Sequence, residues 1–222
     1  DKSKLTGFIE KYSLGNSIES VPWVIKDKPL STNFVSEDRT LLGKVTLNDF
    51  NLSSCEIGVY NTTQLQKMIS VLSNTININL KKADERVIAI HVDDTEVSLN
   101  YMLADLDIIP KAPKLKTIPD TTVVIDIDND FITKFVRAKN ALSESDNFTV
   151  ICDSLCQIVL GESDTNTNKI NINVKASVKN KLAATAFNAN YLKEILAANR
   201  DHTTGKMEVC AGGLAILTFS NA

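Results

Sequence analysis

The sequence YNTTQLQKMISVL at residues 60–72 returns in altered form as FNANYLKEILAAN at residues 187–199. In both stretches an aromatic residue and an asparagine precede apolar residues at helical spacing. The two stretches lie 127 residues apart, and the same offset aligns further apolar segments in the same order. Residues 5–9 align with 132–136, residues 23–25 with 150–152, and residues 87–92 with 214–219. A common order and spacing of this kind indicates one structural unit used twice.

The apolar pattern of each half predicts two helices and several strands. Apolar residues recur at helical spacing in residues 5–12, 65–72, 131–142 and 192–196. Short runs between the helices, such as residues 169–174, alternate apolar and polar side chains, which is typical of strands. We therefore expect an α+β fold of two domains, each with two helices packed on antiparallel sheet.

Proline marks the expected boundary between the halves. Three of the five prolines, Pro110, Pro113 and Pro119, fall within twelve residues of one another. Proline removes a backbone donor and fixes φ, so this stretch is predicted to be an extended connector. The expected organisation is a first domain at residues 1–106, a connector at 107–121 and a second domain at 122–222.

Composition narrows the functional classes. The net charge is −3, and 43% of the residues are hydrophobic, which suits a globular chain. No apolar run is long enough to span a bilayer and no signal-peptide pattern opens the chain, so we expect a cytoplasmic protein without membrane contact. The four cysteines form no CxxC pair. They are interpreted as free thiols in a reducing compartment, with no metal and no cofactor.

One acidic cluster suggests chemistry. Asp126, Asp128 and Asp130 resemble the start of a calcium loop. However, Phe131 stands at the sixth position, which requires Gly, and Arg137 at the twelfth, which requires Glu. The cluster is better interpreted as acids in the first turn of a helix, where the helix dipole favours them. A metal-assisted hydrolase that uses the three aspartates remains the enzymatic alternative, while the main prediction is a protein without catalytic activity.

The predicted helices share cations on the face opposite their apolar stripes. Lysines on solvated helix faces are common, and Glu10 and Glu194 interrupt the pattern. Cations on all four helices of an acidic protein nevertheless predict one basic face on the molecule. The residues expected on this face are Lys4, Lys11, Lys67, Lys134, Arg137, Lys193 and Arg200.

Two such units joined by a proline-bearing connector resemble the DNA sliding clamps, most closely the trimeric clamps of T-even-type bacteriophages. The resemblance rests on residues 47–72 and on residues 127–142, 148–151 and 157–160. It implies a homotrimeric ring that encircles double-stranded DNA and tethers the DNA polymerase. It also implies that the helices line the central hole, so the seven cations of the basic face are expected to face DNA and to contact phosphates without reading bases. It further implies an ATP-driven clamp loader and a role in phage late transcription. A structural ring-forming phage protein is the remaining alternative.

The resemblance also implies a subunit interface and a partner pocket. Strand 96–103 of one chain is expected to pair with strand 169–176 of the next, through Val97, Leu99, Tyr101, Ile170, Ile172 and Val174. The counterpart of strand 96–103 in the second half would begin beyond Ala222, so the junction between domains is expected to differ from the family. A pocket for a partner peptide is expected at the connector, from Ile108, Ile109, Pro110, Leu115 and Ile118, with Leu214 and Ile216 as its floor and Lys111, Lys114 and Lys116 at its rim.

Overall fold

The computed structural model describes residues 1–115, 117–153, 155–162 and 167–221. The chain divides into two compact units, Asp1–Lys114 and Leu115–Ala222. The division falls inside the predicted connector. Among the described residues, no helix is long and apolar enough to cross a membrane.

Unit 1 contains two helices and two antiparallel sheets. The helices are α1 (Lys2–Ser13) and α2 (Thr62–Ser70). One sheet has the strand order β3-β2-β1-β4 and the other has the order β5-β6-β7. The strands are β1 (Val21–Ile25), β2 (Leu30–Val35), β3 (Leu42–Leu47), β4 (Cys55–Val59), β5 (Asn77–Ala83), β6 (Arg86–Asp93) and β7 (Ser98–Met102), followed by the 3-10 helix η1 (Leu106–Ile108).

Unit 2 resembles unit 1, but its described residues form a strand before the first helix, five strands instead of four between the helices, and two strands instead of three after the second helix. Its helices are α3 (Asn129–Ala141) and α4 (Ala189–Ala198). The strand orders are β11-β10-β9-β13 and β12-β8-β14-β15. The strands are β8 (Thr121–Asp126), β9 (Asn147–Cys152), β10 (Cys156–Leu160), β11 (Ile170–Asn173), β12 (Ala176–Val178), β13 (Leu182–Asn188), β14 (Thr204–Cys210) and β15 (Ala215–Ser220).

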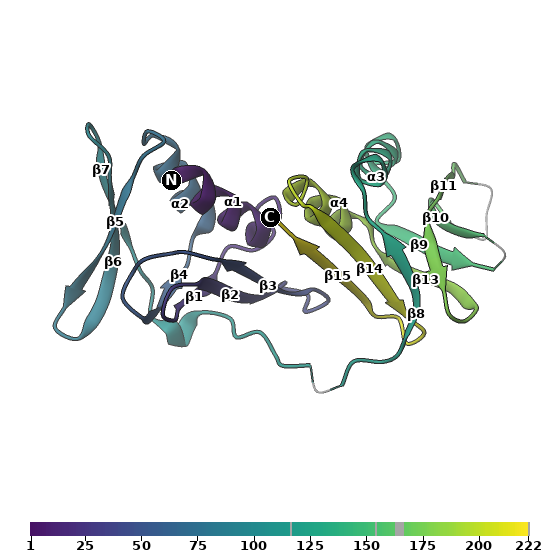
Figure 1. The fold of residues 1–222 in the computed structure, drawn as a ribbon, viewed down its shortest axis with the longest axis horizontal. Coiled ribbons are helices and arrows are strands. Elements are labelled where there is room, and N and C mark those ends of the chain that lie inside the picture. Colours follow the sequence, from purple (N-terminus) through teal and green to yellow (C-terminus); the bar gives the residue numbers. More distant parts are fainter. Residues whose placement is uncertain (116, 154, 163–166, 222) are drawn as a thin grey trace. The chain divides into compact units, whose positions relative to one another are not determined.

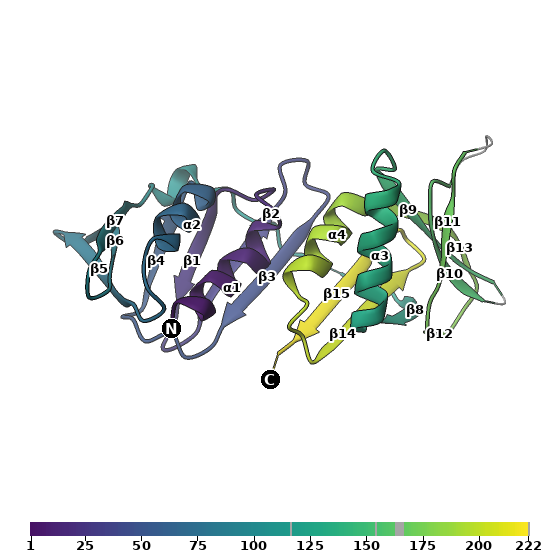
Figure 2. The same ribbon diagram turned by 90° about the horizontal axis from the view of Figure 1, so that it is seen from above.

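The α+β prediction is confirmed. Each unit has two helices, and they lie side by side on one face of that unit's sheets (Figures 1 and 2). The sequence indicated one sheet per unit, whereas the structure has two. The pattern of single strands cannot distinguish these cases, because pairing partners lie far apart in the sequence.

Local chemistry fixes where the helices begin. An Asp or Asn side chain caps each one: the side chain of Asn61 accepts from Gln64 N, and that of Asn188 accepts from Tyr191 N. Asp1 and Asp128 cap α1 and α3 in the same way. These residues satisfy backbone N–H groups that have no partner within the helix.

The apolar stripes of the helices form the cores. In unit 2, Phe131, Phe135 and Leu192 pack with strand residues such as Val150 and Met207, and all are buried. In unit 1, the rings of Phe8, Tyr12 and Trp23 meet edge to face. The burial of one face of each helix leaves the opposite face available to solvent or to a ligand.

The cysteine interpretation requires a correction. Cys152 and Cys156 form a disulfide, whereas the sequence indicated four free thiols. The two residues are cross-strand partners in the β9–β10 hairpin, with their Cα atoms 4.1 Å apart. That spacing is slightly shorter than is usual for bridged cysteines, and the pairing register could not be read from the sequence. Cys55 and Cys210 are free.

Candidate nucleic-acid interface

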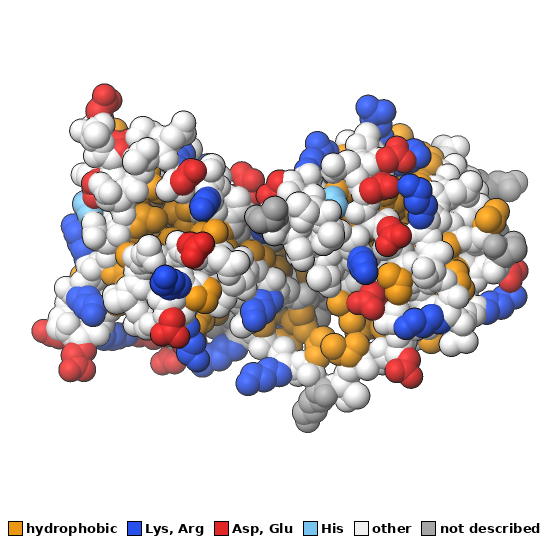
Figure 3. Space-filling model, in the orientation of Figure 1, with side chains coloured by type: hydrophobic (Ala, Val, Ile, Leu, Met, Phe, Trp, Pro, Cys, Tyr) orange, Lys and Arg blue, Asp and Glu red, His pale blue; other side chains and the backbone are white. Residues whose placement is uncertain are grey.

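Six of the seven cations predicted to face DNA lie on the four helices, and Arg200 lies two residues beyond the end of α4. Lys4, Lys67, Lys134, Arg137 and Arg200 are exposed, while Lys11 and Lys193 are half-buried. Figure 3 shows Lys and Arg side chains over α3, at the top of unit 2 in that view, with acidic side chains beside them. Each unit thus presents cations on the helix face that does not contact its sheets.

Two other lysines on these helices serve a structural purpose. The Lys2 ammonium donates to the carbonyl oxygens of Ser70 and Leu72, at 3.0 and 2.5 Å, and so ties α1 to the C-terminal end of α2. Lys139 is only 4% exposed and donates to Ser143 O at 2.7 Å, beyond the end of α3. Cations at helix C-termini satisfy free carbonyl groups and interact favourably with the dipole. The Lys139 ammonium is therefore buried away from any phosphate, and that of Lys2 is held at the end of α2.

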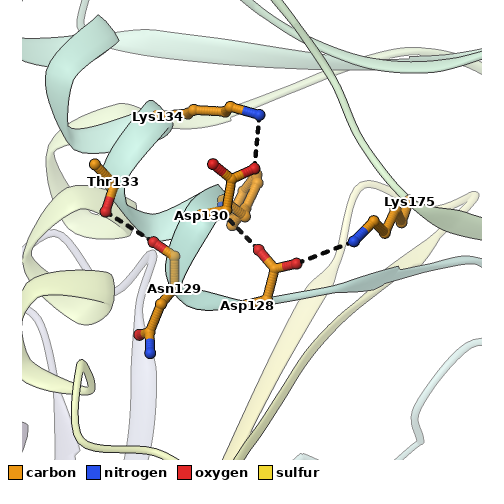
Figure 4. Close-up of polar contacts among 7 residues, drawn as sticks. Asp128, Asn129, Asp130, Thr133, Lys134 and Lys175 are labelled. Carbon is orange, nitrogen blue, oxygen red and sulfur yellow. Dashed lines mark hydrogen bonds and ion pairs between the residues drawn. The ribbon is translucent and has the colours of Figure 1, made fainter.

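At the start of α3, the carboxylates of Asp128 and Asp130 contact other groups of the same chain (Figure 4). The Asp128 carboxylate accepts from Phe131 N at 2.7 Å and lies 3.4 Å from the Lys175 ammonium. The backbone N–H of Phe131, helped by Lys175, holds the pKa of Asp128 below its usual range. Asp130 pairs with Lys134 at 2.6 Å and raises the pKa of that lysine.

These contacts argue against the hydrolase alternative. In the described part of the chain, no three His, Cys, Asp or Glu side chains are placed to hold a metal ion. Asp126 lies at the end of β8, and Asp128 caps the helix that follows. The helix-start interpretation of this cluster is the one that the geometry supports.

The predicted interface strands are sheet edges. β7 lies at one edge of the three-stranded sheet of unit 1, and β11 lies at one edge of a four-stranded sheet of unit 2. Leu99, Tyr101 and Ile172 turn their side chains into the cores, whereas Ile170 and Val174 are half-buried and Val97 is 38% exposed. What these strands offer to a neighbour is therefore mainly their backbone donors and acceptors.

The predicted pocket residues are divided between the two units. In unit 1, Ile108 is 60% exposed and Pro110 is exposed, but Ile109 is buried beside Gly58. Ile109 is therefore part of the core of unit 1, because Gly58 has no side chain to keep it away from β4. The neighbouring Lys111 and Lys114 are exposed.

In unit 2, Leu115 and Ile118 are exposed, while Leu214 and Ile216 are half-buried at β15. The end of the connector reaches the β14–β15 turn, since Cys210 Sγ donates to Pro119 O at 3.3 Å. Lys116 lies outside the described residues.

Sequence reasoning missed a polar network around the start of α2. The Glu19 carboxylate accepts from Thr63 N at 3.0 Å, and Tyr101 OH donates to Asn61 O at 3.0 Å. Glu19, Ser20, Tyr60, Asn61 and Thr63 line a depression of about 380 Å³. None of the predicted pocket residues lines it. Asp146 takes the place of Glu19 in the repeat, and its backbone carbonyl accepts from Ala189 N as that of Glu19 accepts from Thr62 N.

No protein-family model and no curated protein matches the sequence. Among solved structures, the chain is similar to the Proliferating Cellular Nuclear Antigen from Entamoeba histolytica. The TM-score is 0.74 and the sequence identity 14%, and the match covers 100% of this chain and 91% of that one. The chain thus has the fold of a PCNA-type sliding clamp, and the predicted clamp fold is confirmed.

Proposed function

We propose that this protein is a sliding clamp without catalytic activity, which encircles duplex DNA and tethers a DNA polymerase. One observation carries the proposal: in a clamp fold, each of the four helices carries at least one of the predicted cations, exposed on α1, α2 and α3 and half-buried on α4. Such cations attract phosphates without reading sequence, and weak contacts of this kind permit sliding. The decisive test is whether the protein, loaded by an ATP-driven clamp loader, lengthens the products of its polymerase on primed DNA.

The ring in this proposal is a homotrimer. Two units per chain and three chains would supply six units, with β7 of one chain pairing with β11 of the next. Both strands are edges in the chain described here, and closure would cover edges that otherwise invite aggregation. Because the sequence resembles the clamps of T-even-type phages, we further propose that this protein is encoded by a phage and also acts in late transcription.

Neutralising one helix cation should weaken DNA binding equally for all sequences. Lys67→Gln is the first variant, because Lys67 is exposed on α2 and has no carboxylate partner in the part of the chain that the structure describes. The slope of log K against log salt should fall by about 0.9 for each phosphate that the protein no longer neutralises. Binding isotherms on linear duplexes of two sequences, at several salt concentrations, provide the measurement.

Lys81→Gln is the matched control for this prediction. Lys81 is exposed on β5 and pairs with Ala89, so it lies on the sheet face opposite that of Ile90, which is buried. It should leave the salt slope unchanged. If Lys67→Gln leaves the salt slope unchanged, or alters the sequence preference, the prediction that α2 faces DNA is wrong.

The partner site should be sensitive to a charge on the exposed connector residues. Ile108→Asp and Leu115→Asp alter side chains that are 60% and 55% exposed, so both variants should fold and assemble. Loss of an apolar anchor at the centre of a partner site typically costs affinity about 30-fold or more. Polymerase stimulation should fall accordingly, while Leu155→Asp, at a 68% exposed leucine in the β9–β10 turn, should retain it. Full stimulation by both connector variants would place the partner site elsewhere.

A further inference from the structure

Two cations of the proposed DNA-facing set pair with a carboxylate on their own helix: Lys193 lies 4.0 Å from its neighbour Glu194 on α4, and Lys134 makes a much closer contact on α3. Lys134 Nζ lies 2.6 Å from Asp130 Oδ2, one turn earlier on α3, and both side chains are more than half exposed. In Figure 4 the carboxylate of Asp130 points toward Lys134, while that of Asp128 turns toward Lys175. The Asp130–Lys134 pair is thus a separate contact on the outer face of the helix.

Two exposed lysines on the helices of unit 1 differ in this respect. Within the described residues, the exposed Lys4 on α1 and Lys67 on α2 have no carboxylate within ion-pair distance. Four residues before Lys67 stands Thr63, where α3 has an aspartate before Lys134. α3 therefore carries a neutralising acid at a position where α2 has a neutral hydroxyl.

We propose that Asp130 competes with DNA phosphates for Lys134 and thereby weakens the contact of α3 with the duplex. The inference rests on the proposed function. An exposed ion pair between residues i and i+4 is weak, so a phosphate can displace the carboxylate. The displaced carboxylate stays within a few ångströms of the phosphate and repels it, which lowers the net attraction at this point. A sliding protein benefits from contacts that are made and broken rapidly.

Asp130→Asn tests the proposal in the assembled protein. The variant keeps the size and polarity of the side chain and removes only the charge. We expect the dissociation constant for a linear duplex at low salt to fall about two- to fivefold, the range set by the strength of exposed ion pairs. The salt slope should become steeper, because Lys134 then releases a counterion from DNA.

Asp84→Asn is the matched control. Asp84 is exposed in the β5–β6 turn with φ 53°, a conformation that asparagine tolerates well. It changes the net charge by the same amount, at a site away from the helices. Equal tightening by Asp84→Asn and Asp130→Asn would show a general charge effect and overturn the proposal.

Lys134→Gln separates this proposal from the proposed function. We expect Lys134→Gln to weaken DNA binding, and Asp130→Asn to lose most of its effect in the Lys134→Gln background. If Lys134→Gln alone leaves binding unchanged, α3 does not face DNA and its place in the proposed function fails. If Lys134→Gln weakens binding while Asp130→Asn changes nothing, only the competition by Asp130 is overturned. An undiminished effect of Asp130→Asn in the Lys134→Gln background would overturn it as well.

Discussion

Replacing Asn171 by proline should leave unit 2 folded and convert the assembled protein into monomers. The reason lies in the hydrogen-bond register of β11. Val174 N donates to Cys156 O at 3.1 Å, so the N–H groups of Ile172 and Ile170 also point toward β10. The N–H of Asn171 then points away from the sheet, where a neighbouring chain would pair. Proline removes that donor without breaking the ladder to β10, since edge strands tolerate proline on their outer side.

Native mass spectrometry measures the result directly. The chain has a mass of 24.4 kDa, so the proposed trimer has three times that mass. Asn171→Ala keeps the backbone donor and should stay trimeric, which makes it the control for the loss of the side chain. On the other side of the proposed interface, Leu103 N donates to Ile88 O, so the N–H of Met102 points outward from β7. Met102→Pro should therefore dissociate the ring as well.

The possible outcomes test two claims separately: that the protein is a homotrimer, and that β7 and β11 form its interface. A parent protein that is monomeric at tens of micromolar would contradict the homotrimer itself. If the parent protein and both proline variants, Asn171→Pro and Met102→Pro, are trimers, the homotrimer is supported but β7 and β11 do not form its interface. Loss of the trimer in Asn171→Ala would indicate that the asparagine side chain, rather than the edge donor, holds the chains together.

The fold could be predicted because its signals are local and occur twice. Asn61 and Asn188 cap helices at equivalent places in the repeat, and the apolar residues that follow face the cores. Helical periodicity and capping depend on residues within about four positions of one another, and a single sequence contains that information. The repeat then doubled the evidence for each element.

What could not be predicted depends on contacts between distant residues. The Cys152–Cys156 disulfide requires the register of a hairpin, and the two sheets of each unit require strand partners that no local pattern specifies. Lys2 and Lys139 stand at helical spacing from the buried Leu5 and Phe135, so the pattern places them near the apolar stripes, but it does not show that their ammonium groups donate to carbonyls near helix ends. A helical wheel shows the direction of a side chain and not what it meets there.

Ile109 shows the same limit at the connector. Its apolar neighbours Ile108 and Leu115 are exposed, but Ile109 itself is buried at 4%. The sequence of the connector alone does not distinguish the three residues. The difference arises on β4, about fifty positions earlier, where Gly58 leaves room for the Ile109 side chain. A substitution with aspartate at Ile109 would therefore test the stability of unit 1, and Ile108 is the better site for testing partner binding.

Gly58→Ala should destabilise unit 1 by about 1–3 kcal/mol, the usual cost of overpacking a core. A Cβ at this position would lie 2.7 Å from Ala104 O and 3.0 Å from Ile109 Cγ1. The first of these contacts is to backbone, and Ala104 N in turn donates to Gly58 O at 2.9 Å. The start of the connector would have to move away from β4, and Ile108 would move with it. Polymerase stimulation should therefore fall together with stability.

Gly7→Ala is the control, because the same substitution at this position should raise the free energy of unfolding instead of lowering it. Gly7 lies within α1, and a Cβ there meets no heavy atom within 4 Å. Alanine should stabilise the helix by about 0.5–1 kcal/mol relative to glycine. Trp23 is the only tryptophan of the chain and is buried in unit 1, so its fluorescence during denaturant unfolding reports on this unit. Equal midpoints for Gly58→Ala and the parent protein would show that the connector does not depend on the missing side chain. If Gly58→Ala is destabilised and Gly7→Ala is stabilised, the close approach of Ala104 and Ile109 is what requires glycine at position 58.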